Sequence, residues 1–248
     1  MGVMGVDIGG SGIKGCLVDV EKGELETPRF RLDTPDGAKP DEMAEVVRQV
    51  VSHFDYKGPV GYGFPAVILH GVAYTAANID KSWIGLDAAE LFKGFTKCPA
   101  YVLNDADAAG IAEMKFGVGK DFPKGVVLML TLGTGIGSAI FLDGKLVPNL
   151  EFGHLQIRGK DAEHRASDAA RQRKDMSWEK WAERLQEYLS TIESLIWPDV
   201  VILGGGVSKE WQKFMPFLKL RAKILPAQLL NQAGMIGAAL YADEKSKE

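Results

Sequence analysis

The feature that most constrains the fold is a short motif that occurs twice. Gly10-Ser11-Gly12-Ile13 leads into an apolar strand that reaches Asp19, and Gly133-Thr134-Gly135-Ile136 leads into one that reaches Asp143. Each copy lies between two predicted strands and begins a similar series of strands. Four matching positions could arise by coincidence, but the shared context favours duplication. We therefore interpret the chain as two related lobes, with the active site in the crevice between them.

Hydrophobic periodicity predicts an α/β chain with a mixed β-sheet flanked by helices in each lobe. The first lobe is expected to cover residues 1–104 together with a C-terminal helix in 231–248, and the second to cover 105–230. The predicted strands are Val3–Ile8, Ile13–Val20, Leu25–Leu32, Val60–Phe64, Tyr101–Asn104, Val126–Thr131, Ile136–Leu142, Lys145–Val147 and Val200–Leu203, and the predicted helices are Pro40–Phe54, Asp105–Phe116, Trp178–Trp197 and Asn231–Ala242.

The composition excludes several classes of protein. The 248 residues are 46% hydrophobic, which is enough for a large core, and only two are cysteines. A formal net charge of −4 argues against a general nucleic-acid binder, because that role needs a broad excess of Lys and Arg. No secretory leader opens the sequence, and no apolar stretch approaches the ~20 residues of a membrane span. We expect a cytoplasmic enzyme that binds neither membranes nor nucleic acid.

Three glycine-containing segments follow apolar strands and are suited to bind phosphate. A turn without β-carbons lets an oxyanion approach the backbone amides. Asp7, at the end of the first strand, is suited to hold a hydrated Mg²⁺ ion, and Lys14 could neutralise phosphate charge. The alternative is an ordinary hairpin whose glycines serve only the turn. The candidate phosphate-binding residues are Gly9, Gly10, Ser11, Gly12, Lys14, Gly133, Thr134, Gly135, Gly205, Gly206 and Lys209.

The pair Asn104-Asp105 is a candidate catalytic site. It closes an apolar strand and opens a predicted helix, which places a carboxylate near amide donors. Phosphoryl transfer to a hydroxyl group needs such a carboxylate to accept the proton. Asp105 could instead merely cap its helix, and the residues taken alone favour the cap.

Five motifs, in this order, resemble those of ROK-type sugar kinases: DIGGSGIKG, LNDADAAG, LGTGIGSA, LEFGH and LGGGVS. Together they span nearly the whole chain. The resemblance implies the two-lobed actin-like or hexokinase-like ATPase fold of the ribonuclease H type, and a homodimer. It also implies that Asp105 is the general base, and that glucose is bound by residues matching Asn78, Asn104, Asp105, Glu151, His154 and Glu163.

The donor is suggested by a basic stretch at residues 155–175 and by the resemblance. That stretch contains Arg158, Lys160, Arg165, Arg171, Arg173 and Lys174, among which Arg165 and Arg171 are candidate phosphate ligands. A solvated loop is the alternative. Many family members carry a cysteine-rich zinc segment after the sugar-binding histidine, which this chain lacks, so no zinc is expected. The short chain resembles the branch of the family that phosphorylates glucose with inorganic polyphosphate, alone or together with ATP, and Mg²⁺.

Three other functions share parts of this pattern. An ATP-dependent hexose or N-acetylhexosamine kinase of the same family would use the same sugar-binding residues. A sugar-sensing regulator without a DNA-binding domain would keep those residues but would be free to lose Asp7 and Asp105, which are both present. An actin-like structural protein would keep the glycine hairpins without the Glu151-to-His154 segment.

Overall fold

The computed structural model describes residues 2–248, and its contacts divide the chain into two compact units. The first comprises Met1–Ala112 and Gln232–Glu248, and the second comprises Glu113–Asn231. Residues 105–112, which sequence analysis assigns to the second lobe, thus belong with the first unit. Ala108 explains this, because it packs with Leu103 and Ala238.

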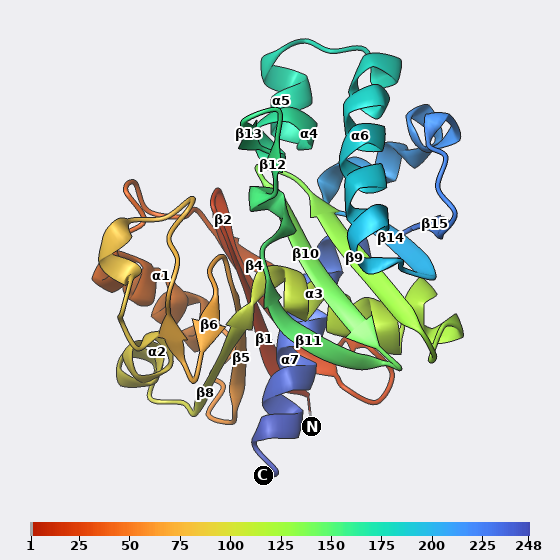
Figure 1. Cartoon of the computed structure of the whole chain (residues 1–248). Helices are drawn as coiled ribbons and strands as arrows, with labels where there is room; N and C mark the ends of the chain where they lie inside the picture. Colours follow the sequence, from red (N-terminus) through yellow and green to blue (C-terminus); the bar gives the residue numbers. More distant parts are fainter. Residues whose placement is uncertain (1) are drawn as a thin grey trace. The chain divides into compact units, whose positions relative to one another are not determined.

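The first unit contains a mixed sheet in the order β3-β2-β1-β5-β8 (Figure 1), with β4 also paired to β2. β1 is antiparallel to β2, and β1, β5 and β8 are parallel to one another. The strands are β1 (Val3–Gly9), β2 (Gly12–Asp19), β3 (Glu24–Leu25), β4 (Phe30–Leu32), β5 (Val60–Phe64) and β8 (Ala100–Asn104), and a separate hairpin joins β6 (Ile68–Leu69) to β7 (Val72–Ala73).

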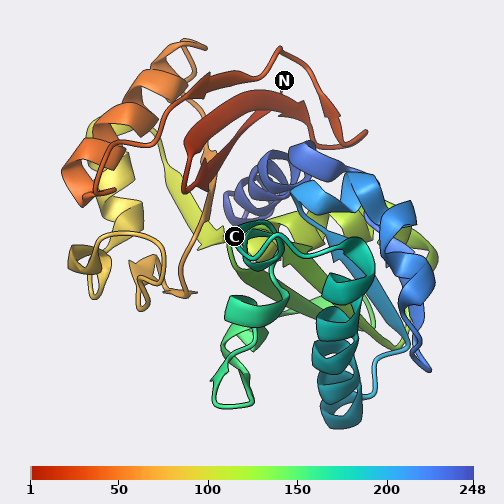
Figure 2. The ribbon, with the colours of Figure 1, turned by 90° about the horizontal axis from the view of Figure 1, so that it is seen from above.

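Helices cover both faces of this sheet because its strands alternate large and small residues. Along β5, Val60, Tyr62 and Phe64 enter the core beneath the helices α1 (Pro40–Ser52) and α2 (Ala88–Thr96). The intervening Gly61 faces α7 (Ala233–Lys245), where a β-carbon would lie only 1.8 Å from the carbonyl oxygen of Ala238. Figure 2 shows α1 and α7 on opposite sides of the red strands. The small residues of α7 therefore allow a helix to lie directly on the sheet.

The second unit repeats the topology of the first. Its sheet has the order β11-β10-β9-β14-β15, with β9 antiparallel to β10 and with β9, β14 and β15 parallel. Both repeated glycine motifs close the antiparallel hairpin at the centre of their sheet, which supports duplication. The strands are β9 (Val126–Leu132), β10 (Ile136–Leu142), β11 (Lys145–Leu150), β14 (Val200–Gly204) and β15 (Lys223–Pro226), with a hairpin of β12 (Gln156–Ile157) and β13 (Lys160–Asp161).

The long helix α6 (Trp178–Ile196) packs on this second sheet. It begins at Ser177, whose hydroxyl accepts the backbone N–H of Lys180, and it buries Trp181, Leu185 and Ile192 along one face. The shorter helices of the chain are α3 (Asp105–Lys115), α4 (Glu163–Ala166), α5 (Asp168–Arg173) and the 3₁₀ turns η1 (Lys81–Trp83), η2 (Val118–Asp121), η3 (Phe152–His154), η4 (Gly206–Lys213), η5 (Met215–Phe217) and η6 (Leu230–Gln232).

One predicted strand is wrong. The run Leu25–Leu32 is not continuous, because β3 and β4 are separated by a bend at Thr27 and by Pro28, which has no N–H to donate to a ladder. The Thr27 hydroxyl instead accepts the N–H of Leu17 on β2. Within residues 2–248, no helix has the length and apolar character that crossing a membrane requires.

Candidate active site

The first glycine turn joins β1 to β2, and side chains from β4 and beyond hold it in place. Gly9 and Gly12 are register partners, the Thr34 hydroxyl donates to the Gly9 carbonyl at 2.6 Å, and the Arg31 guanidinium donates to the Ser11 carbonyl at 2.7 Å. Arg31 was not predicted from the sequence, because nothing local to it indicates that β4 returns to β2 beside the turn. The same guanidinium pairs with Asp33 at 2.7 Å, so the positive charge that it brings to the predicted phosphate site is partly neutralised.

Asp7 and Lys14 face each other across the same hairpin. Their side chains form an ion pair of 3.1 Å and are mostly buried. A β-carbon on Gly234, in the first turn of α7, would lie 3.0 Å from the Asp7 carboxyl carbon, so this carboxylate lies near the positive end of a helix. Among residues 2–248, no cluster of three or more metal-ligating side chains is found. Hydrated Mg²⁺ needs only one or two carboxylates, so Asp7 stays a predicted ligand.

Asn104, rather than Asp105, caps α3. The Asn104 side-chain oxygen accepts the N–H groups of Ala106 at 2.8 Å and Asp107 at 3.2 Å, and its amide nitrogen donates to the Ala66 carbonyl at 3.1 Å. The capping role that sequence analysis weighed for Asp105 is therefore filled by its neighbour. Asp105 is half-buried in the first turn of α3.

Asn78 and Trp83 lie in the same unit but differ in environment. Asn78 is exposed in the loop between β7 and η1, where its side chain is open to a ligand. Trp83 is fully buried against Phe64 at a ring distance of 4.6 Å, and its indole donates to the Ala38 carbonyl. Trp83 therefore belongs to the core beside the predicted sugar-binding loop and is not itself a stacking surface.

The second unit brings together the remaining predicted sugar ligands. His154, at the end of η3, lies 3.7 Å from Glu151 through Nε2, and its Nδ1 lies 2.9 Å from an oxygen of Asp161. A β-carbon on Gly153 would lie 2.4 Å from the Ile136 carbonyl and 3.4 Å from Glu163, so the glycine lets this segment approach β10. Glu163 also accepts the N–H of Ile136, which begins the strand after the second glycine turn.

Asp161 contacts the predicted sugar ligand His154, and sequence analysis did not single it out. It belongs to the β12–β13 hairpin, which places it against the His154 ring. Its hydrogen bond is the main cause that raises the pKa of His154, and the same contact lowers the pKa of Asp161. Burial, followed by the nearby Glu163, raises the pKa of Glu151, while His154 opposes this rise. The segment therefore forms a coupled acid–imidazole cluster with His154 held in a fixed orientation.

The second and third glycine segments lie side by side. Gly205, after β14, has a φ of 84°, and a β-carbon there would lie 2.4 Å from the carbonyl oxygen of Leu132, the residue before Gly133. The buried Ser208 hydroxyl donates to the Gly205 carbonyl at 2.8 Å and fixes the turn. Only glycine fits this close approach, so the two segments form one glycine-lined surface.

A cavity of about 490 Å³ adjoins the third glycine segment. Beside it, the fully buried Glu113 accepts the N–H of Val118, which lines the cavity, at 3.2 Å and the N–H of Leu229 at 2.6 Å. Burial raises the pKa of Glu113, and these backbone donors oppose that rise. The lining residues are Val118, Ser208, Lys209, Trp211, Leu225, Pro226, Ala227, Gln228 and Leu230. The combination of an indole, apolar walls and one lysine suits a flat ring that carries phosphate.

The two arginines predicted to bind phosphate in the basic stretch are already engaged. Arg165 pairs with Glu187 at 2.9 Å. Arg171 pairs with Asp168 at 2.8 Å, and its guanidinium lies 4.0 Å from the centre of the Trp178 ring. Their charges are partly neutralised within the second unit, so their role in phosphate binding stays a prediction.

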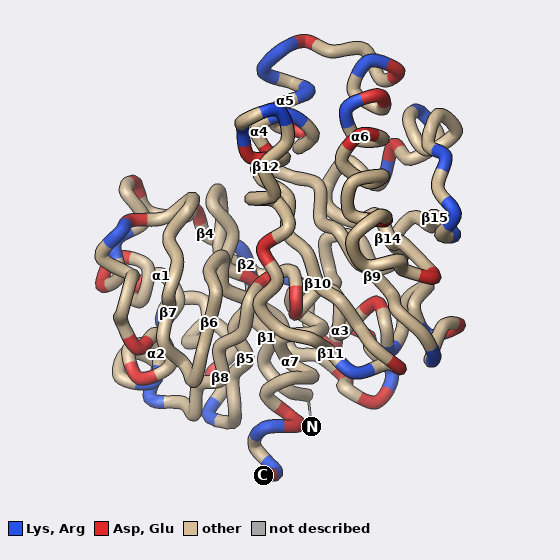
Figure 3. The backbone as a smooth tube through the Cα atoms, viewed as in Figure 1, with Lys and Arg blue, Asp and Glu red and all other residues tan. Residues whose placement is uncertain are grey.

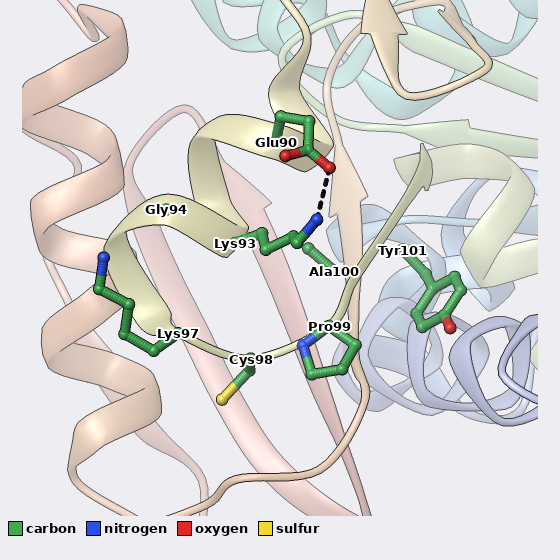
Figure 4. Close-up of a pocket in the computed structure, with 8 residues that line it drawn as sticks. All are labelled: Glu90, Lys93, Gly94, Lys97, Cys98, Pro99, Ala100 and Tyr101. Atoms are coloured by element: carbon green, nitrogen blue, oxygen red, sulfur yellow. Dashed lines mark hydrogen bonds and ion pairs between the residues drawn. The ribbon is translucent and has the colours of Figure 1, made fainter.

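A larger cavity, of about 610 Å³, lies in the first unit at the start of β8, whereas Asp105 follows the end of that strand. Figure 4 shows that its polar groups do not converge, since Lys93 is paired with Glu90 while Lys97 and Tyr101 point to opposite sides. Burial raises the pKa of the Cys98 thiol, which makes it a poor nucleophile. None of the predicted site residues lines this cavity.

Comparison with known proteins identifies the family. The ROK family model matches residues 3–169, and the chain belongs to the ROK family. It is 47% identical over 95% of its length to a polyphosphate glucokinase of Mycobacterium tuberculosis (strain CDC 1551 / Oshkosh), of which it covers 89%.

Solved structures agree. The inorganic polyphosphate/ATP-glucomannokinase of Arthrobacter sp. strain KM matches 98% of this chain and 99% of its own, with 48% identity and a TM-score of 0.95. A ROK family glucokinase of Streptomyces griseus, solved with glucose and AMPPNP, matches 98% of this chain and 100% of its own with 25% identity and a TM-score of 0.82. The predicted fold class, the two-lobed hexokinase-like fold of ROK sugar kinases, is confirmed.

Proposed function

We propose that this chain is a glucokinase that transfers the terminal phosphoryl group of inorganic polyphosphate to the 6-hydroxyl of glucose. The observation that carries the proposal is the match, over 95% of the chain, to a polyphosphate glucokinase at 47% identity. The site supports it, because Asn104 caps α3 and Asp105 is not needed for that role.

The residues of the first unit supply the base and part of the phosphate site. Asp105 accepts the proton of the 6-hydroxyl as that oxygen forms a bond to the terminal phosphorus, and the bond from this phosphorus to the shortened polyphosphate breaks. Asn78 holds a sugar hydroxyl. Lys14 and the first glycine turn bind phosphate oxygens, and Asp7 would hold Mg²⁺ through water. Mg²⁺, when bound, offsets charge on the phosphates.

The residues of the second unit hold the sugar and the donor. Glu151 and Glu163 accept hydrogen bonds from sugar hydroxyls, and His154 presents Nε2 because Asp161 occupies its Nδ1. The surface formed by Gly133, Thr134, Gly135, Gly205 and Gly206 approaches phosphate oxygens through its backbone. A cytoplasmic location and a homodimer remain expectations of this proposal. Cys16 and Cys98 are both free and buried, which agrees with a reducing compartment.

ATP is a second candidate donor, favoured by the cavity beside Lys209. Its 490 Å³ and its Trp211 suit a purine ring. The related Arthrobacter enzyme is named for the use of both polyphosphate and ATP, and for both glucose and mannose. An N-acetylhexosamine substrate has no comparable support.

The direct test is formation of glucose 6-phosphate by purified protein with glucose and Mg²⁺, with nucleotide-free polyphosphate or ATP as donor. We expect product with polyphosphate. Mannose in place of glucose then tests whether the site accepts the opposite configuration at C2 of the sugar. Product with ATP alone would keep the kinase and refute the polyphosphate donor. No product with either donor would refute the proposed function.

A further inference from the structure

Around α5 and the start of α6, four cations make no ion pair with any side chain in residues 2–248, although they lie among arginines that do. Arg158 and Arg165 both pair with Glu187, and Arg171 pairs with Asp168. Figure 3 shows Lys and Arg segments gathered at α4, α5 and the first turns of α6. The unpaired set, here called the cation cluster, consists of Lys160 on β13, Arg173 and Lys174 at the end of α5, and Arg184 on α6.

Arg184 is the member that the surrounding fold leaves least satisfied. One terminal nitrogen of its guanidinium is buried, and no acceptor in the described part of the chain reaches it. A buried donor without an acceptor lowers stability, and the loss is greater when the donor is charged. Such an unmet donor on a cation is suited to an anionic acceptor that arrives from outside the protein.

The members of the cluster also repel one another. Burial lowers the pKa of Lys174, and the charges of Arg184, Arg173, Lys160 and Arg165 lower it further. These side chains therefore lie within electrostatic range of one another, in a chain whose net charge is −4. Like charges held close together are unfavourable unless an anion binds between them.

The helix α5 links this cluster to the second glycine turn. At its start, the N–H of Ala169 donates to the Gly133 carbonyl at 3.0 Å, and at its end lie Arg173 and Lys174. Six helical residues span roughly 9 Å, so the cluster lies beyond the phosphates that the glycine turn itself would bind.

We propose that the cation cluster binds the distal part of a linear polyphosphate chain whose terminal phosphates lie at the glycine turns. This inference rests on the proposed function, which it deepens by naming Arg184 and by replacing Arg165 and Arg171 as the principal contacts. A chain of many phosphates reaches both regions, whereas the triphosphate of ATP engages only the turns. The cluster is therefore a determinant of donor length.

The test compares the double variant Lys174→Gln/Arg184→Gln with the wild type. The control is Lys180→Gln. Lys180 lies on α6, as Arg184 does, but it is already paired with Glu183. Each charged hydrogen bond lost raises KM roughly tenfold in a buried setting, and less where water screens it. We expect KM for long-chain polyphosphate to rise by about ten- to hundredfold, with a weaker salt dependence, while KM for tripolyphosphate, ATP and glucose stays within about twofold.

Thermal denaturation shows whether the double variant folds normally. Because the substitutions remove mutual repulsion, its Tm should be unchanged or higher than that of the wild type. An unchanged KM for long-chain polyphosphate overturns the proposal, as does an equal rise for tripolyphosphate and ATP. If the wild type shows no turnover with polyphosphate, the proposed function fails separately. In that case, calorimetric titration with long-chain polyphosphate still tests the cation cluster. Binding by the wild type that the double variant loses supports the cluster, and absence of binding by the wild type overturns it.

Discussion

Replacing Asn104 tests whether its side chain stabilises the fold or binds the sugar. Sequence analysis places Asn104 among the sugar-binding residues, yet its side chain makes three hydrogen bonds within its own unit. Asn104→Ala removes the cap of α3, which is worth about 1 kcal/mol, and leaves the buried Ala66 carbonyl without this donor at about 1–3 kcal/mol. We expect the free energy of unfolding to fall by about 2–4 kcal/mol.

Urea denaturation followed by circular dichroism measures this loss, which corresponds to a midpoint shift of about 1 M or more. Asn104→Asp keeps an acceptor for the cap but cannot donate to Ala66, so it should lose less stability than the alanine variant. Asn78→Ala is the matched control, because this exposed asparagine should raise KM for glucose without changing stability. If Asn104→Ala raised KM for glucose at unchanged stability, Asn104 would be a ligand and the capping argument would be refuted.

Three further predictions concern the base, the histidine and the packing of α7. Asp105→Asn should lower kcat by about 10²–10⁴-fold with little change in glucose affinity, and retention of most turnover would exclude Asp105 as the base. Asp161→Asn should lower the pKa of His154, which an NMR titration measures. Because that pKa is raised on folding, the protonated His154 stabilises the fold fully below pH 6.5, and this contribution is lost as pH rises through the folded pKa. In the Asp161→Asn variant, the free energy of unfolding should therefore depend less on pH in this window. Gly61→Ala should lower the free energy of unfolding by about 1–3 kcal/mol, because its β-carbon would overlap the Ala238 carbonyl. Gly94→Ala in α2 is the control: its β-carbon meets open space, so it should stabilise the protein by about 0.5–1 kcal/mol. Equal effects of the two variants in urea denaturation would contradict the packing argument.

The parts of the fold that were predictable from the sequence depend on local pattern. The repeated glycine motif predicts two hairpins of the same kind, and both sheets have that hairpin at their centre. The break at Thr27 and Pro28 was missed because residues 25–32 begin and end with apolar residues that suit a strand, and the proline between them was not weighed. The helix α2 and the β6–β7 hairpin were also missed, because they are short: α2 has nine residues and each strand of the hairpin has two.

The parts of the site that were not predictable depend on contacts between distant segments. Arg165 and Arg171 were chosen for their charge, but whether a charge can bind phosphate depends on Glu187 and Asp168. Asp161 lies seven positions from His154 and reaches it only because a hairpin folds back. Capping by Asn104 depends on side-chain geometry that the pair Asn104-Asp105 leaves ambiguous.

The shared topology explains why each unit carries its predicted site residues at one edge of its sheet. The carboxyl ends of parallel strands meet at the same edge. In the first unit that edge carries the turn after β1 and Asp105 after β8, and in the second unit it carries the turn after β9 and Gly205 after β14. The larger cavity, at the opposite end of β8, lies outside this arrangement. The two edges are thus equivalent in topology, as duplication would give, but one carries the proposed catalytic carboxylate and the other carries a second glycine segment.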